Sequence, residues 1–188
     1  GVGKTTLLRV LLGELTPDAG YLKIGHNVAF GYYDQGQLLL SDANTVLEEL
    51  KESYRLYTDT EMRSILGRFL FRGEEVFLPV GSLSGGEKAR LSLLKLMLSG
   101  ANTLILDEPT NHLDIQSQQV LQKALSEYPG SYCIVSHNRS FLDPIVTKVL
   151  EFVPGEKPRV YLGNVSDYLE KVEREQALAA AARNIINR

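Results

Sequence analysis

The chain has 188 residues, enough for one domain with a sizeable hydrophobic core. Hydrophobic residues make up 44% and charged residues 23%, as in ordinary globular proteins, and no apolar run approaches the ~20 residues of a membrane span. The net charge of −3 argues against a chain that binds nucleic acid over its whole surface, although a local basic patch remains compatible with it. The single cysteine, Cys133, excludes an internal disulfide and fits a reducing compartment, and its apolar neighbours predict a buried position in a strand.

Helical and extended hydrophobic patterns alternate along the chain, which is typical of an α/β fold. Helices are predicted over residues 5–12, 45–57, 61–71, 84–98, 115–128 and 166–188. Strands are predicted over residues 27–33, 103–106, 131–136, 148–153 and 159–162. Because two helices follow each other after residue 40, we expect a mostly parallel sheet flanked by helices, with an inserted helical subdomain. Capping boxes are predicted at Thr45 with Glu48 and at Ser84 with Glu87.

The first six residues, Gly-Val-Gly-Lys-Thr-Thr, match the second half of the phosphate loop G-x-x-x-x-G-K-[ST]. Glycines allow backbone N–H groups to converge on phosphates, and the following helix directs its positive end toward them. Lys4 would reach the β- and γ-phosphates, and the Thr5 hydroxyl would be a ligand of Mg²⁺. On this segment alone, an ordinary glycine turn before a helix fits equally well.

A second segment, residues 103–108, is an apolar strand that ends in two acids. A buried strand would deliver Asp107 to a Mg²⁺ ion, which prefers hard oxygen ligands. Glu108, one residue further, could accept a proton from an attacking water or orient that water. A simple strand-to-turn junction is the alternative, and a phosphate loop about a hundred residues upstream makes it the weaker one.

The third segment, residues 83–90, places Ser84 and two glycines at the start of a helix. Its hydroxyl and backbone N–H groups would form an anion-binding nest at a helix N-terminus. Since no Lys-Thr pair follows, it is not a second phosphate loop, and it makes physical sense as a contact to a γ-phosphate held by another domain. Taken alone, the segment favours a plain capped helix after a glycine turn.

Together the three segments resemble the ATP-binding cassette family, whose Walker A, signature and Walker B motifs correspond here to GVGKTT, LSGGE and ILDEP. The resemblance implies a P-loop NTPase fold. It also implies that residues 1–165 form an incomplete cassette, which begins inside Walker A and contains the helical subdomain at about 40–100. Residues 166–188 would be a C-terminal helical extension.

The same resemblance assigns the site residues. Those expected to bind the domain's own ATP are Gly1, Val2, Gly3, Lys4, Thr5, Thr6 and Gln35. Those expected to contact the ATP of an opposing cassette are Ser84, Gly85, Gly86 and Glu87, with Asp114 in the D-loop that crosses the interface. Metal ligands would be Thr5, Gln35 and Asp107. The expected catalytic residues are Glu108, acting on water, and His137, contacting the γ-phosphate.

The D-loop sequence Asn111-His112-Leu113-Asp114 differs from the Ser-Ala-Leu-Asp type of transporter cassettes. Together with residues 67–77, 135–142 and 163–169, it resembles the second cassette of ABC-F proteins. These proteins have two cassettes in one chain and no membrane domain, and characterised members act on the ribosome as translation factors or antibiotic-resistance proteins.

The resemblance therefore implies cytoplasmic, Mg²⁺-dependent ATP hydrolysis, with a second cassette and the ribosome as partners. The alternatives are a transporter subunit and a non-hydrolysing scaffold. The 188 residues alone are expected to be nearly inactive. Gly36 and Asn138 depart from the residues usual in the group.

Overall fold

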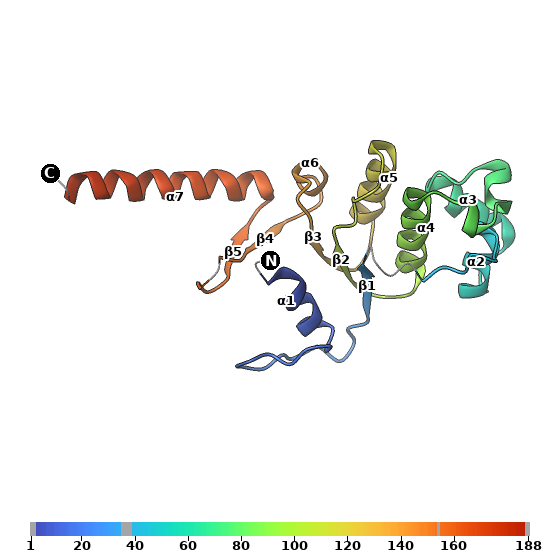
Figure 1. Cartoon of the computed structure of the whole chain (residues 1–188), viewed down its shortest axis with the longest axis horizontal. Helices are drawn as coiled ribbons and strands as arrows, with labels where there is room; N and C mark the ends of the chain where they lie inside the picture. The colour runs from blue at the N-terminus through green and yellow to red at the C-terminus, as the bar shows by residue number, and fades with distance from the viewer. Residues whose placement is uncertain (1–2, 35–38, 154, 187–188) are drawn as a thin grey trace. The chain divides into compact units, whose positions relative to one another are not determined.

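The computed structural model describes residues 3–34, 39–153 and 155–186 (Figure 1). Two compact units make up the chain. The larger spans Thr5–His137, and the smaller joins Asn138–Arg188 to Gly1–Lys4. Within the described residues, no helix combines the length and the apolar character that crossing a membrane requires.

Three parallel strands form the sheet of the larger unit. They lie in the order β1 (Phe30–Asp34), β2 (Thr103–Asp107) and β3 (Ser131–Val135), so that β2 pairs with both neighbours. The three middle residues of β2 are buried, as expected for a strand covered on both faces. Because the strands are parallel and in register, their carboxyl ends meet at one edge, which is where open α/β sheets bind ligands.

Helices flank this sheet, in agreement with the predicted α/β class (Figure 1). They are α1 (Lys4–Leu11), α4 (Gly85–Leu98) and α5 (Ile115–Ser126). The packing of α4 on β1 is close, because a Cβ atom at Gly31 would lie 2.8 Å from the Leu96 side chain. Glycine at this position therefore allows the helix to lie directly on the strand.

A helical cluster precedes and includes α4. It contains α2 (Val46–Ser53), α3 (Asp59–Arg68) and the short 3₁₀ turns η1 (Gly73–Phe77) and η2 (Val80–Ser82). Its buried core combines aliphatic, methionine and phenylalanine side chains: Val46, Leu47, Leu50, Met62, Leu66, Phe69, Phe71, Val76, Val80, Leu83, Leu91 and Leu94. The buried Glu49 of α2 is paired with Lys95 of α4 at 2.7 Å, so this buried acid has its counter-charge.

Capping side chains fix where these helices begin. The predicted boxes are present, since Thr45 accepts from the Glu48 N–H, and Ser84 from the Glu87 N–H. A further box, Thr58 with Glu61, starts α3 and was not predicted. Each box satisfies backbone N–H groups that a helix start otherwise leaves without partners.

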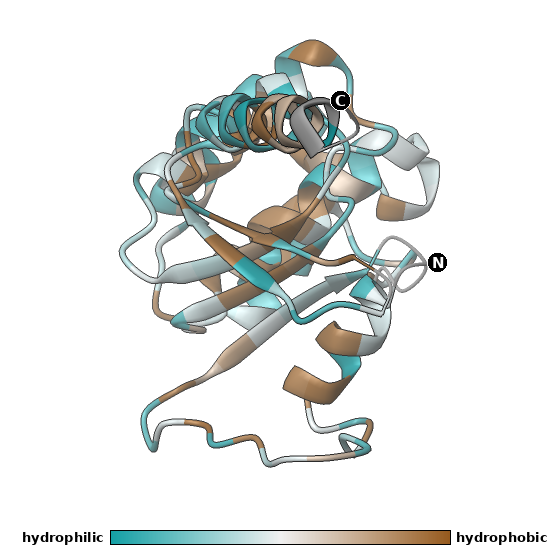
Figure 2. Ribbon diagram, turned by 90° about the vertical axis from the view of Figure 1, so that its left-hand side faces the viewer, coloured by the Kyte–Doolittle hydropathy of each residue, from teal (hydrophilic) through white to brown (hydrophobic). Residues whose placement is uncertain are grey.

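The smaller unit contains α6 (Arg139–Leu142), the antiparallel pair β4 (Lys148–Glu151) and β5 (Arg159–Leu162), and α7 (Val165–Ile186). The start of α7 is fixed to the strand pair by Tyr168, which stacks edge-on against Tyr161 and donates to Glu151 at 2.7 Å. Figure 2 shows α7 changing from hydrophilic to more apolar residues toward its C-terminal end.

Three details differ from the sequence-based expectations. The prediction that Cys133 is buried was wrong, because β3 lies at the edge of the described sheet and the residue is exposed. The predicted helix 61–71 ends at Arg68, since Leu70 adopts the left-handed conformation with φ 67°. The first strand begins at Phe30 and not at residue 27.

Candidate functional site

The carboxyl edge of the sheet brings together two of the predicted metal ligands. Asp107 is the last residue of β2, and Thr5 lies in the first turn of α1. The Thr5 hydroxyl is 3.5 Å from Asp107 Oδ2, although 102 positions separate the two residues in the chain. A hydroxyl and a carboxylate are the hard oxygen ligands that Mg²⁺ prefers, and this ion commonly combines few protein ligands with phosphates and water. Thr5 and Asp107 therefore fit Mg²⁺.

The two predicted catalytic side chains meet directly after the sheet. Glu108 Oε1 lies 3.3 Å from His137 Nε2, which forms an ion pair when the imidazole is protonated. The Glu108 carboxylate is mostly covered, with 23% of its side chain exposed, whereas His137 is 81% exposed. A partly desolvated carboxylate beside an accessible imidazole is an arrangement that can position and deprotonate a water molecule.

The backbone of Glu108 is held in an unusual conformation. Its φ angle is 48°, in the left-handed region that costs a non-glycine residue roughly 1–3 kcal/mol. The Glu108 N–H donates to the Val135 carbonyl at 2.7 Å, so the strand that leads to His137 fixes this turn. Such strain is common where a side chain must be aimed at a reaction site.

The signature segment lies at the start of α4. Ser84 and Glu87 cap this helix reciprocally, with the Ser84 N–H and hydroxyl both donating to the Glu87 carboxylate at 2.8 and 2.9 Å. Residues 84–87 and Asp114 line one hollow of about 580 Å³. Asp114 also caps α5 by accepting from the Ser117 N–H at 2.7 Å. Asp114 accepts hydrogen bonds from the Ser117 side chain and from its backbone N–H. These bonds hold the pKa of the Asp114 carboxyl below its usual range.

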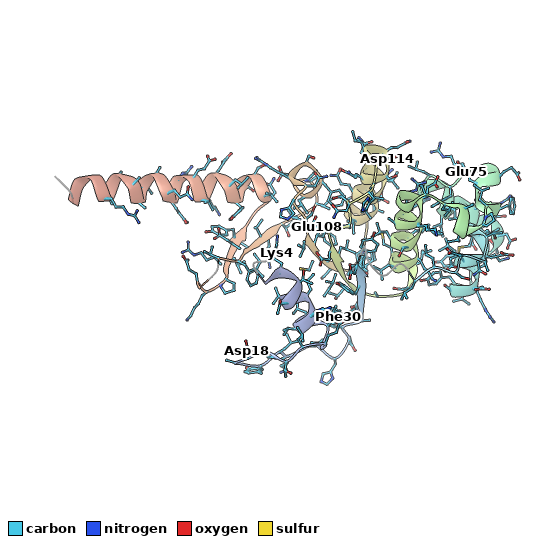
Figure 3. The ribbon with its side chains drawn as sticks, in the orientation of Figure 1. Lys4, Asp18, Phe30, Glu75, Glu108 and Asp114 are labelled. Carbon is cyan, nitrogen blue, oxygen red and sulfur yellow. The ribbon has the colours of Figure 1, made fainter. Side chains whose placement is uncertain are left out.

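The remaining predicted residues are only partly covered by the structure. Gly3 and Lys4 precede and begin α1, while Gly1, Val2 and Gln35 lie outside the described residues. Figure 3 labels Glu108 and Asp114, which come from the loop between β2 and α5, and Lys4 at the start of α1. Sequence reasoning did not single out Arg90, whose side chain reaches the start of α5; only its helical spacing from Gly86 could have indicated this.

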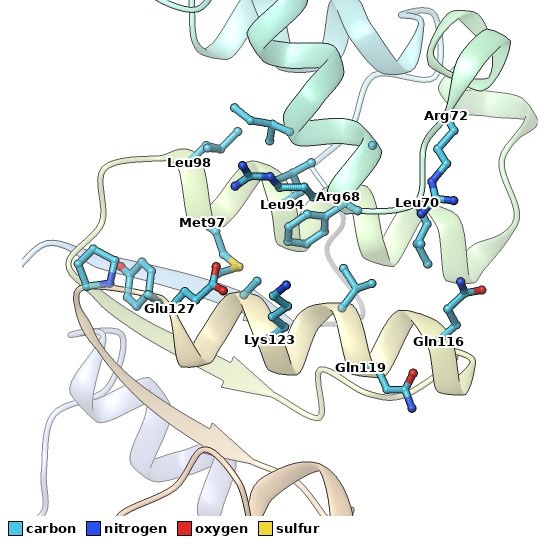
Figure 4. A pocket seen from close by; sticks show the side chains of 17 residues that line it. Arg68, Leu70, Arg72, Leu94, Met97, Leu98, Gln116, Gln119, Lys123 and Glu127 are labelled. Carbon is cyan, nitrogen blue, oxygen red and sulfur yellow. The ribbon is translucent and has the colours of Figure 1, made fainter.

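A larger groove runs along α5 and contains none of the predicted site residues (Figure 4). Its volume is about 920 Å³, and its walls come from the end of α3, the last turns of α4 and the length of α5. It shares Leu70 and Gln116 with the hollow at the signature segment. The groove therefore adjoins the hollow at the signature segment, and none of the predicted site residues lines it.

Comparison with protein families shows a match of residues 1–111 to the ABC transporter family. The chain belongs to this family. The matched region covers the phosphate loop, the signature and Walker B segments, and the start of the D-loop, so the ATP-binding cassette predicted from the sequence is confirmed.

Curated relatives place this ABC-family chain near the F group. It is 52% identical over 171 residues to the putative ATP-binding protein YdiF of Bacillus subtilis, covering 91% of this chain and 26% of that protein. It is 40% identical over 178 residues to the energy-dependent translational throttle protein EttA of Escherichia coli K12. This match covers 93% of this chain and 32% of that protein. It is 39% identical over 195 residues to ABC transporter F family member 5 of Arabidopsis thaliana. This match covers 98% of this chain and 28% of that protein.

The chain thus spans about a quarter to a third of the length of the relatives that it matches.

Two solved structures share the fold of this ABC-family chain. The archaeal ribosome recycling factor aABCE1, in complex with the ribosomal stalk protein aP1, has a TM-score of 0.67 at 23% identity, covering 90% of this chain and 35% of that one. The RNase-L inhibitor has a TM-score of 0.70 at 22% identity, and the match covers 92% of this chain and 35% of that one.

Proposed function

We propose that this chain is an ATPase cassette that binds Mg²⁺ and ATP and hydrolyses the nucleotide at an interface with a second cassette. The observation that carries the proposal is the meeting of Glu108 and His137, 3.3 Å apart, at the strand ends beside Asp107. Hydrolysis of a phosphoanhydride at this edge requires three groups. They are an acid that can act on water, an imidazole and a carboxylate that binds the metal.

In this proposal each side chain has one task. Lys4 and the backbone N–H groups at the start of α1 neutralise and hold the phosphates, while Thr5, Asp107 and Gln35 bind the metal. Bound Mg²⁺ would supply charge neutralisation on the phosphate oxygens. Glu108 orients the attacking water and accepts its proton, and His137 donates a hydrogen bond to the γ-phosphate.

The proposal extends to the remaining predicted binding residues and the domain limits. Gly1, Val2, Gly3 and Thr6 complete the nucleotide cradle, and residues 84–87 with Asp114 serve the ATP of the opposing cassette. Residues 1–165 belong to the cassette, which includes the helical subdomain at about 40–100, and residues 166–188 form a helical extension. Because half of each site comes from the opposing cassette, the 188 residues alone should hydrolyse almost no ATP.

We further propose that the complete protein acts on the ribosome in the cytoplasm. The support is the 40% identity to a protein named as a translational throttle and the 39% identity to an F family member. A transporter subunit, the other reading of the sequence, has no comparable support among these relatives. A non-hydrolysing scaffold would not need both Glu108 and His137 at the strand ends.

The test is Glu108→Gln in the complete natural protein. The amide keeps the shape of the side chain but removes its basic oxygen, so ATP binding should persist while turnover falls. Loss of a positioned base typically slows the reaction 10²–10⁴-fold, on the order of 3–5 kcal/mol. Since ATP would bridge two cassettes, the variant should stay closed, accumulate on ribosomes in co-sedimentation and arrest protein synthesis.

A matched control is Glu74→Gln, which changes an exposed acid of η1 in the same way. Turnover in this control should equal that of the parent. Unchanged turnover in Glu108→Gln would refute the catalytic assignment. Slow turnover without ribosome association would support the ATPase activity and reject the ribosomal role.

A further inference from the structure

The first turn of the signature helix α4 touches the loop that follows Walker B. A Cβ atom at Gly86 would lie 2.6 Å from the carbonyl oxygen of His112, closer than any side chain tolerates. The helix and the loop are therefore in direct backbone contact. His112 itself is left-handed, with φ 62°, a conformation that a non-glycine residue keeps only when its surroundings impose it.

This loop, residues 108–114, is a fixed connection between the two candidate sites. At its start, Glu108 is held to the Val135 carbonyl at 2.7 Å. Within it, the Asn111 and Leu113 N–H groups donate to the Glu108 and Thr110 carbonyls at 3.2 and 3.1 Å. Thr110 and Leu113 are buried. A movement imposed on one end of such a braced segment is carried to the other, because it has few internal rotations left to absorb it.

Arg90, four residues after Gly86 and hence on the same face of α4, anchors the far end of the loop. Its Nη1 donates to the Ser117 hydroxyl at 2.7 Å, and its guanidinium lies 4.7 Å from the centre of the Phe71 ring. Ser117 is buried, and its N–H is the group that Asp114 caps. Arg90 thus connects α4 to the first turn of α5, to which Asp114, the last residue of the loop, is also hydrogen-bonded.

Stability alone explains this arginine poorly. Its Nε is buried and has no hydrogen-bond partner among the described residues, which costs roughly 1–3 kcal/mol. An unbranched apolar side chain could cover Phe71 without that cost. The guanidinium adds what such a side chain lacks, namely a donor in a rigid plane directed at Ser117.

We propose that Arg90 is a positioning residue that fixes the loop 108–114 to the signature helix, so that ATP bound at residues 84–86 sets the position of Glu108 in the same cassette. The coupling rests on the proposed ATPase function. It makes hydrolysis in one site conditional on nucleotide in the other, through contacts inside a single cassette.

The test compares Arg90→Ala, Arg90→Lys, Ser117→Ala and the double variant Arg90→Ala/Ser117→Ala in the complete natural protein. Arg90→Ala should lower kcat at least ~10-fold while KM for ATP changes less than about twofold. Arg90→Lys keeps the charge but not the planar donor, so it should remain slow. The double variant should be no slower than Arg90→Ala, because both changes break one connection.

Hydrogen exchange of the loop 108–114 gives a second measurement that needs no turnover. Its amides should exchange faster in Arg90→Ala than in the parent. The matched control is Arg63→Ala, which removes an arginine stacked on Phe77 at 4.8 Å in α3, and which should alter neither kcat nor exchange of the loop.

Three results would overturn the proposal: an unchanged kcat in Arg90→Ala, an equal loss in Arg63→Ala, or unchanged exchange of the loop amides. A parent protein with no more turnover than Glu108→Gln would refute the ATPase function instead. In that case the exchange measurement still decides whether Arg90 holds the loop.

Discussion

The two helices that the sequence assigns to phosphate groups begin in opposite ways. Before α1 stands Gly3, with φ 90° and no side chain, and its first turn contains Lys4 and no acidic residue. At the start of α4, Ser84 and Glu87 bind each other, and the glutamate carboxylate accepts both donors of the serine. The start of α1 offers its N–H groups and a cation, whereas at the start of α4 the Ser84 and Glu87 N–H groups and the Ser84 hydroxyl are already paired within the capping box.

The difference indicates how tightly each helix start should hold an anion by itself. A phosphate reaching α1 meets positive charge and a favourable dipole, with no side chain to displace. A phosphate reaching α4 must compete with the Glu87 carboxylate for the Ser84 hydroxyl, and the two negative charges repel. We therefore expect the signature segment to bind only a nucleotide already held on the opposing cassette.

The largest expected contrast is between Lys4→Ala and Ser84→Arg. Losing a charge-assisted contact worth ~1.5–3 kcal/mol should weaken binding of a fluorescent ATP analogue by roughly 10–100-fold in Lys4→Ala. Ser84→Arg places its bulk in the hollow at α4 and should leave that binding within about twofold, while turnover falls at least ~10-fold. Loss of analogue binding in Ser84→Arg would show that α4 serves the nucleotide of its own cassette.

Local sequence patterns were enough to predict much of both sites. Four apolar residues before Asp107 define a buried strand that ends in an acid, and the spacing of Ser84 and Glu87 defines a capping box. The family resemblance gave Glu108 and His137 their separate roles, but their pairing was not predicted, because it depends on two neighbouring strands.

The features that were missed depend on contacts between distant residues. The first strand starts late because the Asn102 side chain accepts from the Ala29 N–H at 2.9 Å and donates to the Asn27 carbonyl, in place of a strand partner. The contact of Gly86 with the His112 carbonyl involves a left-handed histidine, which no local pattern predicts. Cys133 has the neighbours of a core residue, and only the position of β3 at the sheet edge exposes it.

A smaller effect is expected when the charge at the start of α4 is removed. In Glu87→Gln the amide oxygen can still accept from Ser84, so the helix start should persist. Removing ~1 kcal/mol of repulsion should lower the ATP concentration for half-maximal turnover by roughly 3–10-fold. Glu61→Gln makes the same change in the box of α3 and should have no such effect. An unchanged or higher ATP requirement in Glu87→Gln would mean that its carboxylate does not face the incoming phosphate.

The smallest effect concerns the capping box at the start of α2, Thr45 with Glu48, to which no ligand contact is assigned. Hydrogen bonds from the Thr45 backbone and then its side chain lower the pKa of Glu48. A folded-state pKa below the unfolded value, about 4.3 for glutamate, stabilises the fold above that pH and loses this contribution as the pH falls through the folded pKa. Glu48→Gln keeps the box but cannot ionise, so its melting temperature should lie slightly below that of the parent at pH 7. The gap should close on acidification below pH ~4, because the parent carboxyl is then protonated. A gap that stays constant across this range would show that ionisation of Glu48 contributes nothing to α2, and that a capping box acts through its geometry alone.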